Sequence, residues 1–295
     1  MKPAPFKYHA PTTVDEVVGL LAEHGYDAKI LAGGQSLIPT MNFRLAQPAV
    51  LIDINAVSEL AYIKSNGDGG LRVGALARHA EAEHSRLVAE VAPLVHATMP
   101  LIAHPQIRNR GTLCGSLAHA DPASELPAVL VALQGRVRAS RQGGSRWIAA
   151  EEFFQGIFTT ALEPDELLAE AAFPPLPSRS GWAIQEVARR HGDFALAGAV
   201  AVVQVDEGGT CTAARLVFFG VGEGPVLARQ AGAALVGAEP TEQRIADAAA
   251  LAANNDVPTP HEDIHASSAY RRHLVEVLGR RALSQAFARA TAEER

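Results

Sequence analysis

The sequence predicts an α+β protein with two domains. A length of 295 residues fits roughly two domains of about 150 residues each. The run Pro174-Pro175-Leu176-Pro177-Ser178 is the clearest linker signal, because prolines end regular structure. Before it strands and helices are mixed, whereas after it three strands precede three alanine-rich helices, an order typical of helices packed on one side of an antiparallel sheet. We therefore expect domains at 1–177 and 178–295.

The first third of the chain carries the strongest local signals. Thr13 and Glu16 form a capping box, apolar residues at helical spacing follow, and Gly25 ends the helix. Short apolar runs then predict strands at 29–32 and 49–54. A glycine-rich turn at 66–70 predicts a hairpin between 62–64 and 71–76.

The middle of the chain alternates helix and strand signals. We expect a long amphipathic helix from Glu81 to about Thr98, an irregular polar loop over 104–110, and a loop over 111–116. A short helix should begin near Glu125 and cover 126–133. Further strands are predicted at 136–140, 146–148 and 167–173.

The C-terminal domain reads as sheet followed by helices. Strands are expected at 183–189, 196–205 and 211–221, separated by the turns 191–193 and 206–209. Helices are expected near 225–236, 241–254 and 267–290.

Composition excludes several classes of function. A net charge of -6 offers no electrostatic footprint for nucleic acid or an anionic membrane. No stretch approaches the roughly 18 apolar residues of a membrane span, and the N-terminus does not read as a signal peptide. Two cysteines, Cys114 and Cys211, cannot form a disulfide framework or supply the roughly four ligands of an iron–sulfur cluster. We expect a cytoplasmic protein.

The first candidate binding segment is Ala32-Gly33-Gly34-Gln35-Ser36, directly after an apolar strand. Paired glycines allow close approach of the backbone to a ligand. Successive N–H groups in such a turn can bind an anion such as a pyrophosphate, and Ser36 adds a hydroxyl. The spacing matches neither the Rossmann fingerprint nor the P-loop, so a plain tight turn is the alternative.

The second candidate segment is Gly111-Thr112-Leu113-Cys114-Gly115-Ser116, followed by His119-Ala120-Asp121-Pro122. It again combines small residues with a hydroxyl and a carboxylate. Asp121 or Glu125 could accept hydrogen bonds from sugar or ribityl hydroxyls. A loop that merely needs small residues is the alternative, but two such segments about 80 positions apart favour a bipartite phosphate site.

These residues carry a family resemblance that covers nearly the whole chain. The run 32–36, the run from Gln106-Ile107-Arg108-Asn109 to Glu125-Leu126-Pro127, and the segment Glu186–Ala195 resemble the flavin subunits of the molybdenum hydroxylases. That group includes the medium subunits of aerobic carbon monoxide dehydrogenase and the FAD subunits of bacterial xanthine dehydrogenases. The resemblance implies an FAD domain of the vanillyl-alcohol oxidase (PCMH) type in two subdomains, followed by the C-terminal domain of the carbon monoxide dehydrogenase flavoproteins.

By resemblance, the chain binds one FAD non-covalently. The two segments would hold the pyrophosphate, the strand before the first would give backbone contacts, and Asp193 and Phe194 would lie on a loop near the flavin ring. The full set of implied FAD contacts is Lys29, Ile30, Leu31, Ala32, Gly33, Gly34, Gln35, Ser36, Ile102, Gly111, Thr112, Leu113, Cys114, Gly115, Ser116, His119, Asp121, Glu125 and Leu168. No catalytic side chain and no metal ligand is expected.

The sequence departs from the family pattern at two positions. Cys114 replaces the first of two glycines, where a Cβ could move the pyrophosphate or disfavour a strained φ. A redox role for this thiol is conceivable, although inert packing is commoner for a lone buried cysteine. Ser116 replaces the usual asparagine and can still donate a hydrogen bond.

Other reactive residue types do not form recognisable sites. His79, His84 and His96 lack metal-ligand spacing, and Ser124 does not lie in a nucleophile elbow. The polar loop with His261, Asp263 and His265 could bind an adventitious metal, but a solvated loop is the simpler interpretation.

The resemblance implies electron relay as the function. A large subunit would carry the molybdenum cofactor, a small subunit two 2Fe-2S clusters, and this chain would pass electrons through FAD to NAD, a quinone or another acceptor. The assembly would be a dimer of heterotrimers. Two alternatives remain open: a stand-alone FAD oxidoreductase acting on a small molecule, and a non-catalytic nucleotide-binding or assembly subunit. The substrate cannot be read from this chain.

Overall fold

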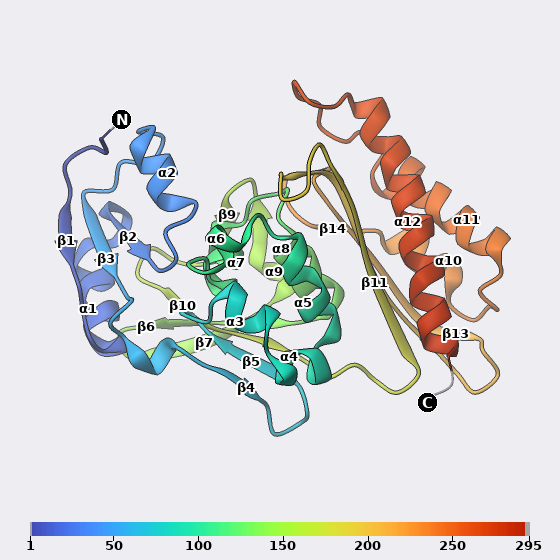
Figure 1. Cartoon of the computed structure of the whole chain (residues 1–295), viewed down its shortest axis with the longest axis horizontal. Helices are drawn as coiled ribbons and strands as arrows, with labels where there is room; N and C mark the ends of the chain where they lie inside the picture. The colour runs from blue at the N-terminus through green and yellow to red at the C-terminus, as the bar shows by residue number, and fades with distance from the viewer. Residues whose placement is uncertain (1, 293–295) are drawn as a thin grey trace.

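The computed structural model describes residues 2–292. It contains a three-stranded sheet, a five-stranded sheet and a four-stranded sheet, which follow one another along the chain and along the long axis of the molecule in Figure 1. Helices separate and cover these sheets. The expected α+β class is therefore confirmed; the first two of these sheets precede the proline linker and the third follows it.

The first sheet is parallel and small. Its strands β1 (Lys7–His9), β2 (Ala28–Leu31) and β3 (Val50–Asp53) lie in the order β1-β3-β2, which leaves β2 at an edge. Helix α1 (Val14–His24) connects β1 to β2 and begins at the expected capping box, while α2 (Leu37–Asn42) follows the first candidate segment. Strand β1 and helix α2 had no clear sequence signal.

The second sheet is antiparallel, in the order β4-β5-β10-β6-β7. Its strands are β4 (Ile63–Ser65), β5 (Leu71–Gly74), β6 (Arg136–Arg141), β7 (Gly144–Ala149) and β10 (Leu167–Phe173). All five were expected from the sequence. Helices α7 (Leu113–His119) and α9 (Ala150–Phe153) pack against this sheet, whereas α8 (Glu125–Ala132) contacts α7 and α9 and packs against the third sheet. The short strands β8 (Phe154–Gly156) and β9 (Thr159–Thr160) form a separate hairpin.

The expected long helix over 81–98 is wrong. Three short helices occupy this stretch: α3 (His79–Glu83), α4 (Arg86–Val91) and α5 (Pro93–Thr98). Ser85 starts α4 by accepting a hydrogen bond from the Val88 amide, and Pro93 occupies the first turn of α5. A proline cannot donate to the preceding turn, so the helix restarts there at a new angle.

The expected loops over 104–116 are also partly helical. One helical turn, α6 (Pro105–Arg108), replaces the irregular loop, and Leu113–Ser116 belong to α7. Thr112 is the N-cap of α7, because its hydroxyl accepts the Gly115 amide at 3.1 Å. In the second candidate segment, Thr112 is therefore extended and caps the helix, and the residues from Leu113 onward form the first turn of α7.

The C-terminal domain contains the third sheet and the last three helices. The antiparallel strands are β11 (Ser180–Ala188), β12 (Ala195–Val205), β13 (Cys211–Phe219) and β14 (Val226–Leu227). The helices are α10 (Arg229–Leu235), α11 (Glu242–Leu251) and α12 (Ser268–Thr291), and α12 lies along β11 and β12 (Figure 1). Apart from the two-residue β14, these elements match the expectations.

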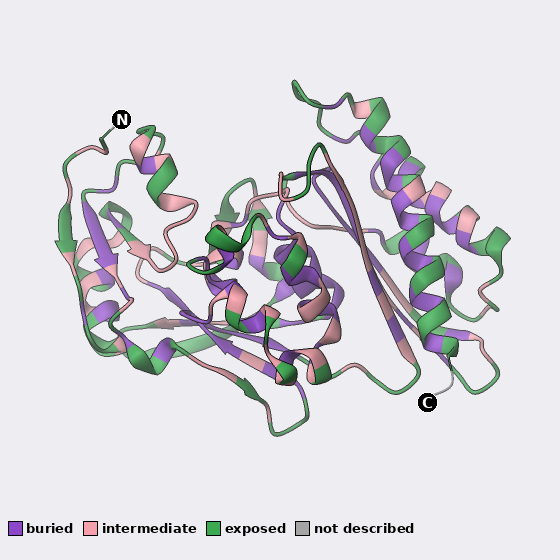
Figure 2. Cartoon of the chain, in the orientation of Figure 1, coloured by how far each residue is buried: buried purple, intermediate pink, exposed green. Residues whose placement is uncertain are grey.

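Both faces of the third sheet are largely buried: β12 is buried along nearly its whole length and β13 over its second half, as the purple strands of this sheet in Figure 2 indicate. On one face Ala199 and Ala201 pack in the core beneath α12. On the other, Val200 and Val217 join the core of the second sheet and its helices. This explains why β12 is a nearly continuous apolar run with no alternation. The apolar face ties the C-terminal domain to the rest of the molecule.

Within residues 2–292, no helix is long and apolar enough to cross a membrane.

Candidate functional site

The two candidate segments meet in space. A Cβ placed on Gly33 would lie 2.6 Å from the carbonyl oxygen of Arg110 and 2.7 Å from the Cα of Gly111. Only a glycine at position 33 therefore allows the two backbones to touch. The neighbouring Gly34 has φ +72°, a left-handed conformation that a β-branched residue rarely adopts.

A polar link of two side chains, Asn55 and Arg78, holds the segments together. The Asn55 amide donates to the carbonyl oxygen of Ala32 at 2.9 Å. Arg78 donates through Nη2 to the Asn55 carbonyl at 2.6 Å and through Nη1 to the backbone oxygen of Arg110. The chain Ala32–Asn55–Arg78–Arg110 thus connects the first segment to the second. We call this set of contacts the Asn55–Arg78 link.

The turn after β3 positions Asn55. Asp53 accepts hydrogen bonds from the backbone amide and side chain of Asn55 at 2.9 and 2.6 Å, and from the Tyr8 hydroxyl at 2.7 Å. Desolvation alone would raise the pKa of Asp53, but the hydrogen bonds from Asn55 and Tyr8 lower it. Asp53 is therefore an ionised acceptor that fixes the Asn55 side chain at the carboxyl end of the parallel sheet.

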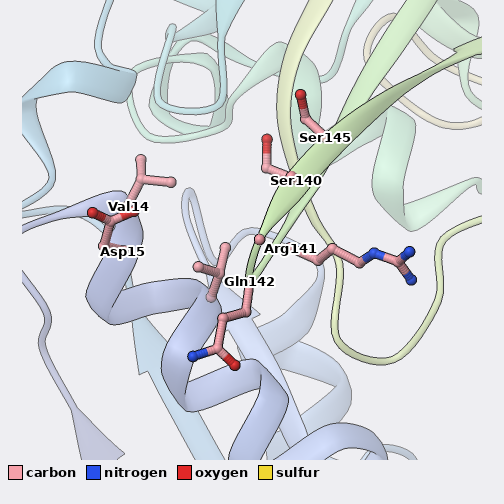
Figure 3. A pocket seen from close by; sticks show the side chains of 9 residues that line it. Val14, Asp15, Ser140, Arg141, Gln142 and Ser145 are labelled. Atoms are coloured by element: carbon pink, nitrogen blue, oxygen red, sulfur yellow. The ribbon is translucent and has the colours of Figure 1, made fainter.

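A hollow of about 320 Å³ opens beside this junction. Its lining includes the first segment, the start of α2, and the polar side chains Asp53, Asn55 and Arg110. Arg110 is exposed, so its guanidinium is available to an anion in the hollow. A larger hollow of about 510 Å³, between the start of α1 and the β6–β7 hairpin (Figure 3), contains none of the expected binding residues.

The side chains of the second segment do not all face the junction. Leu113 and Cys114 are 0% and 2% exposed and belong to the core, so only their backbones can contact a ligand. The Cys114 thiol lies 3.6 Å from the Val73 carbonyl, and complete burial raises its pKa. These contacts favour the packing role for Cys114, because a buried neutral thiol is a poor nucleophile and redox group.

The buried residue His79 packs against Gly111 and is hydrogen-bonded to it. His79 is 5% exposed, and its amide donates to the Gly111 carbonyl at 3.0 Å. A Cβ on Gly111 would come within 2.9 Å of His79 Nδ1. Burial lowers the pKa of His79 to about 4, so the ring is neutral at physiological pH.

The segment after α7 contains two residues in unusual backbone conformations. Ala120 ends α7 with φ +51°, and Phe158 of the β8–β9 hairpin has φ +51° and donates its amide to the Ala120 carbonyl. The Phe158 ring lies 5.0 Å from that of His119, and burial lowers the pKa of His119. The Asp121 carboxylate accepts the Ala123 amide at 2.9 Å and shapes the turn into α8.

Glu125 is less accessible to a bound molecule than the other predicted binding side chains at the end of α7. It is 7% exposed at the first turn of α8, and burial together with the nearby Glu186 of β11 raises its pKa to about 8. Burial also raises the pKa of Glu186 to about 7, and its Oε2 atom has no hydrogen-bond partner among the described residues. The charge of Glu186 is near enough to disfavour ionisation of Glu125, so a raised pKa keeps Glu125 largely protonated near pH 7.

The turn around Ile102 is held by a buried arginine. Arg108 donates to the carbonyls of Ile102 and Ala103 at 3.0 and 3.3 Å and forms a two-point ion pair with Glu83. Ala103 has φ +45°. A Cβ on Gly192 would collide with His104, so the turn between β11 and β12 lies against this region. Phe194 on that turn is 64% exposed.

The structure thus brings together 32–36 and 111–112, with β2 beside them. Because β2 is an edge strand, one side of the Lys29–Leu31 backbone is open to a ligand. Leu168 is 5% exposed and belongs to the core on β10. The backbone amides, the hollow and Arg110 fit a dinucleotide pyrophosphate, with the polar atoms of Asp53 and Asn55 beside it.

Sequence reasoning missed Asp53, Asn55, Arg78 and Arg110. One signal was present: Asp53-Ile54-Asn55 stands at the end of a buried strand that is parallel to the strand before the first segment. The carboxyl ends of parallel strands meet at one sheet edge. Nothing comparable marks Arg78. Within residues 2–292 no group of three or more His, Cys, Asp or Glu could hold a metal ion. The His261–His265 loop has another role, since Asp263 pairs with Arg271 at 2.6 Å.

Comparisons with known proteins find matches along nearly the whole chain. Residues 4–176 match the model of the FAD binding domain in molybdopterin dehydrogenase, and residues 182–286 that of the CO dehydrogenase flavoprotein C-terminal domain. The chain is 42% identical to the 6-hydroxypseudooxynicotine dehydrogenase complex subunit alpha of Paenarthrobacter nicotinovorans, covering 98% of this chain and 97% of that one. It is 37% identical to the carbon monoxide dehydrogenase medium chain of Afipia carboxidovorans, covering 98% and 99%.

Solved structures are similar over the same length. A carbon monoxide dehydrogenase chain from Hydrogenophaga pseudoflava superposes with a TM-score of 0.94 at 37% identity, covering 98% of this chain and 99% of that one. A chain of quinoline 2-oxidoreductase from Pseudomonas putida 86 gives a TM-score of 0.92 at 37% identity, covering 99% and 100%.

Proposed function

The chain belongs to the FAD-binding medium subunits of the molybdenum hydroxylases, and from this premise we propose how its residues hold FAD and serve the complex. Subunits of this family relay electrons between the iron–sulfur clusters of a partner and an external acceptor. When bound, FAD supplies chemistry that accepts one or two electrons, while the protein supplies binding, orientation and electrostatics.

The contact between Gly33 and Gly111 carries this proposal. Two glycine-containing segments that are far apart in the sequence touch through their backbones, and the Asn55–Arg78 link fixes their spacing. We assign the pyrophosphate to the amides of 32–36 and to the entry of α7 at 111–116. Arg110 supplies a compensating positive charge.

The remaining contacts follow from the surroundings of the second segment. We assign Ser116, His119 and Asp121 to the ribityl or ribose oxygens, because these side chains are only half-buried at the end of α7. Ile102 and the turn with Asp193 and Phe194 are assigned to the flavin ring. Leu168 is also assigned to the flavin ring and Glu125 to the ribityl or ribose oxygens, since both are buried to about the same degree as Ile102.

We also propose the organisation of the complex. Residues 1–177 form the FAD domain and 178–295 the C-terminal domain. The partners are an iron–sulfur small subunit and a molybdopterin large subunit that carries the substrate site, assembled as a dimer of heterotrimers. The acceptor is NAD or a quinone-type molecule. A cytoplasmic location is supported by two buried cysteines that form no disulfide.

The test compares the subunit alone with the native complex. The isolated protein should be yellow and release FAD, not FMN, on denaturation. Anaerobic addition of an oxidisable substrate should bleach the flavin absorbance only when the iron–sulfur and molybdopterin subunits are present. Rapid bleaching of the isolated chain by an organic substrate would instead support a stand-alone oxidoreductase. FAD that never bleaches in the active complex would support a non-catalytic subunit.

A further inference from the structure

The solvent-facing side of the second sheet carries a patch unlike the rest of the molecule. Across the strands, Lys64 lies opposite Arg72, Arg72 opposite Ala172, and Ala172 opposite Arg136. Residues opposite each other in neighbouring strands share a face, so the three cations form a row. We call the set Tyr62, Lys64, Arg72, Arg136, Arg138 and Trp147 the outer sheet patch.

A second row runs beside the first. Glu170, two residues from Ala172 on β10, lies opposite Arg138, which in turn lies opposite Trp147. Glu170 is 1% exposed and accepts from the Tyr62 hydroxyl, with Arg72 at 3.6 Å and Arg138 at 3.8 Å. The one carboxylate in these two rows is therefore buried, while the cations around it reach solvent.

The aromatic rings hold the cations in fixed positions. The Arg136 guanidinium lies 4.5 Å from the centre of the Trp147 ring and that of Arg72 lies 5.6 Å from it, while Lys64 lies 4.3 Å from the centre of the Tyr62 ring. A guanidinium group that is stacked on a ring has little conformational freedom left, so it loses little further entropy on binding.

The charge of the patch opposes the charge of the chain. Lys64 and Arg136 are exposed and make no salt bridge within residues 2–292, and the Arg138 side chain is 36% exposed. Asp68, at the tip of the β4–β5 hairpin, is hydrogen-bonded inside its own turn. A protein with net charge -6 thus presents a local cationic surface containing a 36% exposed tryptophan.

We propose that the outer sheet patch is a docking surface for a carboxylate-rich surface of another subunit of the complex. Arg, Trp and Tyr are the residue types enriched at the centre of protein interfaces, and exposed cations such as Lys64 and Arg136 pair with carboxylates. This inference rests on the proposed function, because the partner is a subunit of that complex.

The experiment uses the FAD-loaded chain with the co-expressed iron–sulfur and molybdopterin subunits. The variant Lys64→Glu/Arg136→Glu reverses two cations outside the FAD site, and Arg280→Glu/Arg281→Glu on the exposed side of α12 is the matched control. Dissociation constants for each separated partner are measured by biolayer interferometry at low and high NaCl. We expect the patch variant to bind one partner at least about tenfold more weakly, with a smaller salt dependence, at unchanged FAD content.

The outcomes separate the two proposals. Wild-type affinity in the patch variant would overturn the docking surface but leave the proposed function intact. Failure of wild-type, FAD-loaded chain to associate with either subunit would instead contradict the proposed function. A self-association of the isolated chain that the patch variant abolishes, with normal assembly, would assign the patch to a second copy and overturn the inference. Oligonucleotide binding that only the patch variant loses, again with normal assembly, would also overturn it.

Discussion

Two arginines perform similar chemistry in different parts of this molecule. Arg78 donates to the Arg110 carbonyl and to Asn55 at the junction of the FAD segments. Arg271 of α12 donates to the carbonyls of Leu196 and Gly220 and to Asp263. Arg78 is half-buried beside an open hollow, whereas Arg271 is 2% exposed.

The difference in burial assigns the two links to different tasks. Water can take the place of the Arg78 guanidinium at the oxygens that it binds, so the Asn55–Arg78 link adds little to overall stability. Its main effect is to set the spacing of the two candidate segments. Water cannot replace Arg271 easily, because its carbonyl partners are buried at the ends of β12 and β13. An arginine that bridges backbone carbonyls can therefore position a binding site where it is solvated, as Arg78 does. Where it is buried, as Arg271 is, it contributes mainly to the stability of the fold.

The largest expected effect is on the buried link. Arg271→Met should lower the free energy of unfolding by about 3–5 kcal/mol, because two buried carbonyls and Asp263 lose their partner. Urea unfolding followed by circular dichroism measures it. Arg272→Met, one position away on the exposed side of α12, is the control and should stay within about 0.5 kcal/mol of wild type. Equal stability of the two variants would contradict the assignment.

The next largest effect is expected at the backbone contact between Gly33 and Gly111, whose spacing the Asn55–Arg78 link maintains. Gly33→Val should leave no FAD bound after purification, a loss of at least about 100-fold in affinity, because its side chain would push the two segments apart. Gly34→Val should act similarly through its left-handed φ. Flavin absorbance per protein measures both. Gly67→Val, at a turn where a Cβ meets nothing within 4 Å, should keep wild-type FAD. Normal flavin content in both site variants would refute the pyrophosphate assignment.

The Asn55–Arg78 link itself should give a smaller change. Arg78→Met should weaken FAD binding about tenfold, or about 1.4 kcal/mol, and barely change the unfolding free energy of the apoprotein. Arg78→Lys should recover part of the affinity, because an ammonium can reach one acceptor but lacks the two-armed geometry. Titration of apoprotein with FAD provides the constants, with the exposed Arg86→Met as control. A stability loss as large as that of Arg271→Met would remove the distinction between the two arginines.

The smallest effect concerns the carboxyl pair between the domains. Burial raises the pKa of Glu186 to about 7 and that of Glu125 to about 8, so the folded chain holds protons that the unfolded chain releases above its ordinary carboxyl pKa. This stabilisation is present at low pH and is lost as pH rises through about 7–8. Glu186→Gln should therefore be about 1 kcal/mol more stable than wild type at pH 8.5 and show a flatter stability profile.

Thermal or urea unfolding between pH 5 and pH 9 would measure this profile. Glu207→Gln, in the exposed β12–β13 turn, is the control and should follow the wild-type curve. A wild-type stability that increases between pH 6 and pH 8.5 would contradict the raised pKa values.

The sequence predicted most elements because their signals are local. The capping box of Thr13 and Glu16 starts α1 where expected, and apolar runs located the strands of the second and third sheets. The failures have local causes too. Pro93 and Ser85 divide the expected helix over 81–98, and the Thr112 cap converts an expected loop into the start of α7. A helical period of apolar residues continues across such breaks and hides them.

What the sequence determined by itself is the family, the α+β class and the two glycine segments, since motifs of consecutive residues can be read in one dimension. Only the tertiary structure decided that Gly33 touches Gly111, that Asn55 and Arg78 link the two segments, and that Cys114 and Glu125 turn away from solvent. The physical reason is that close approach and burial depend on atoms far apart in the chain. The cations of the outer sheet patch, spread from Lys64 to Arg138, likewise become neighbours only through strand register.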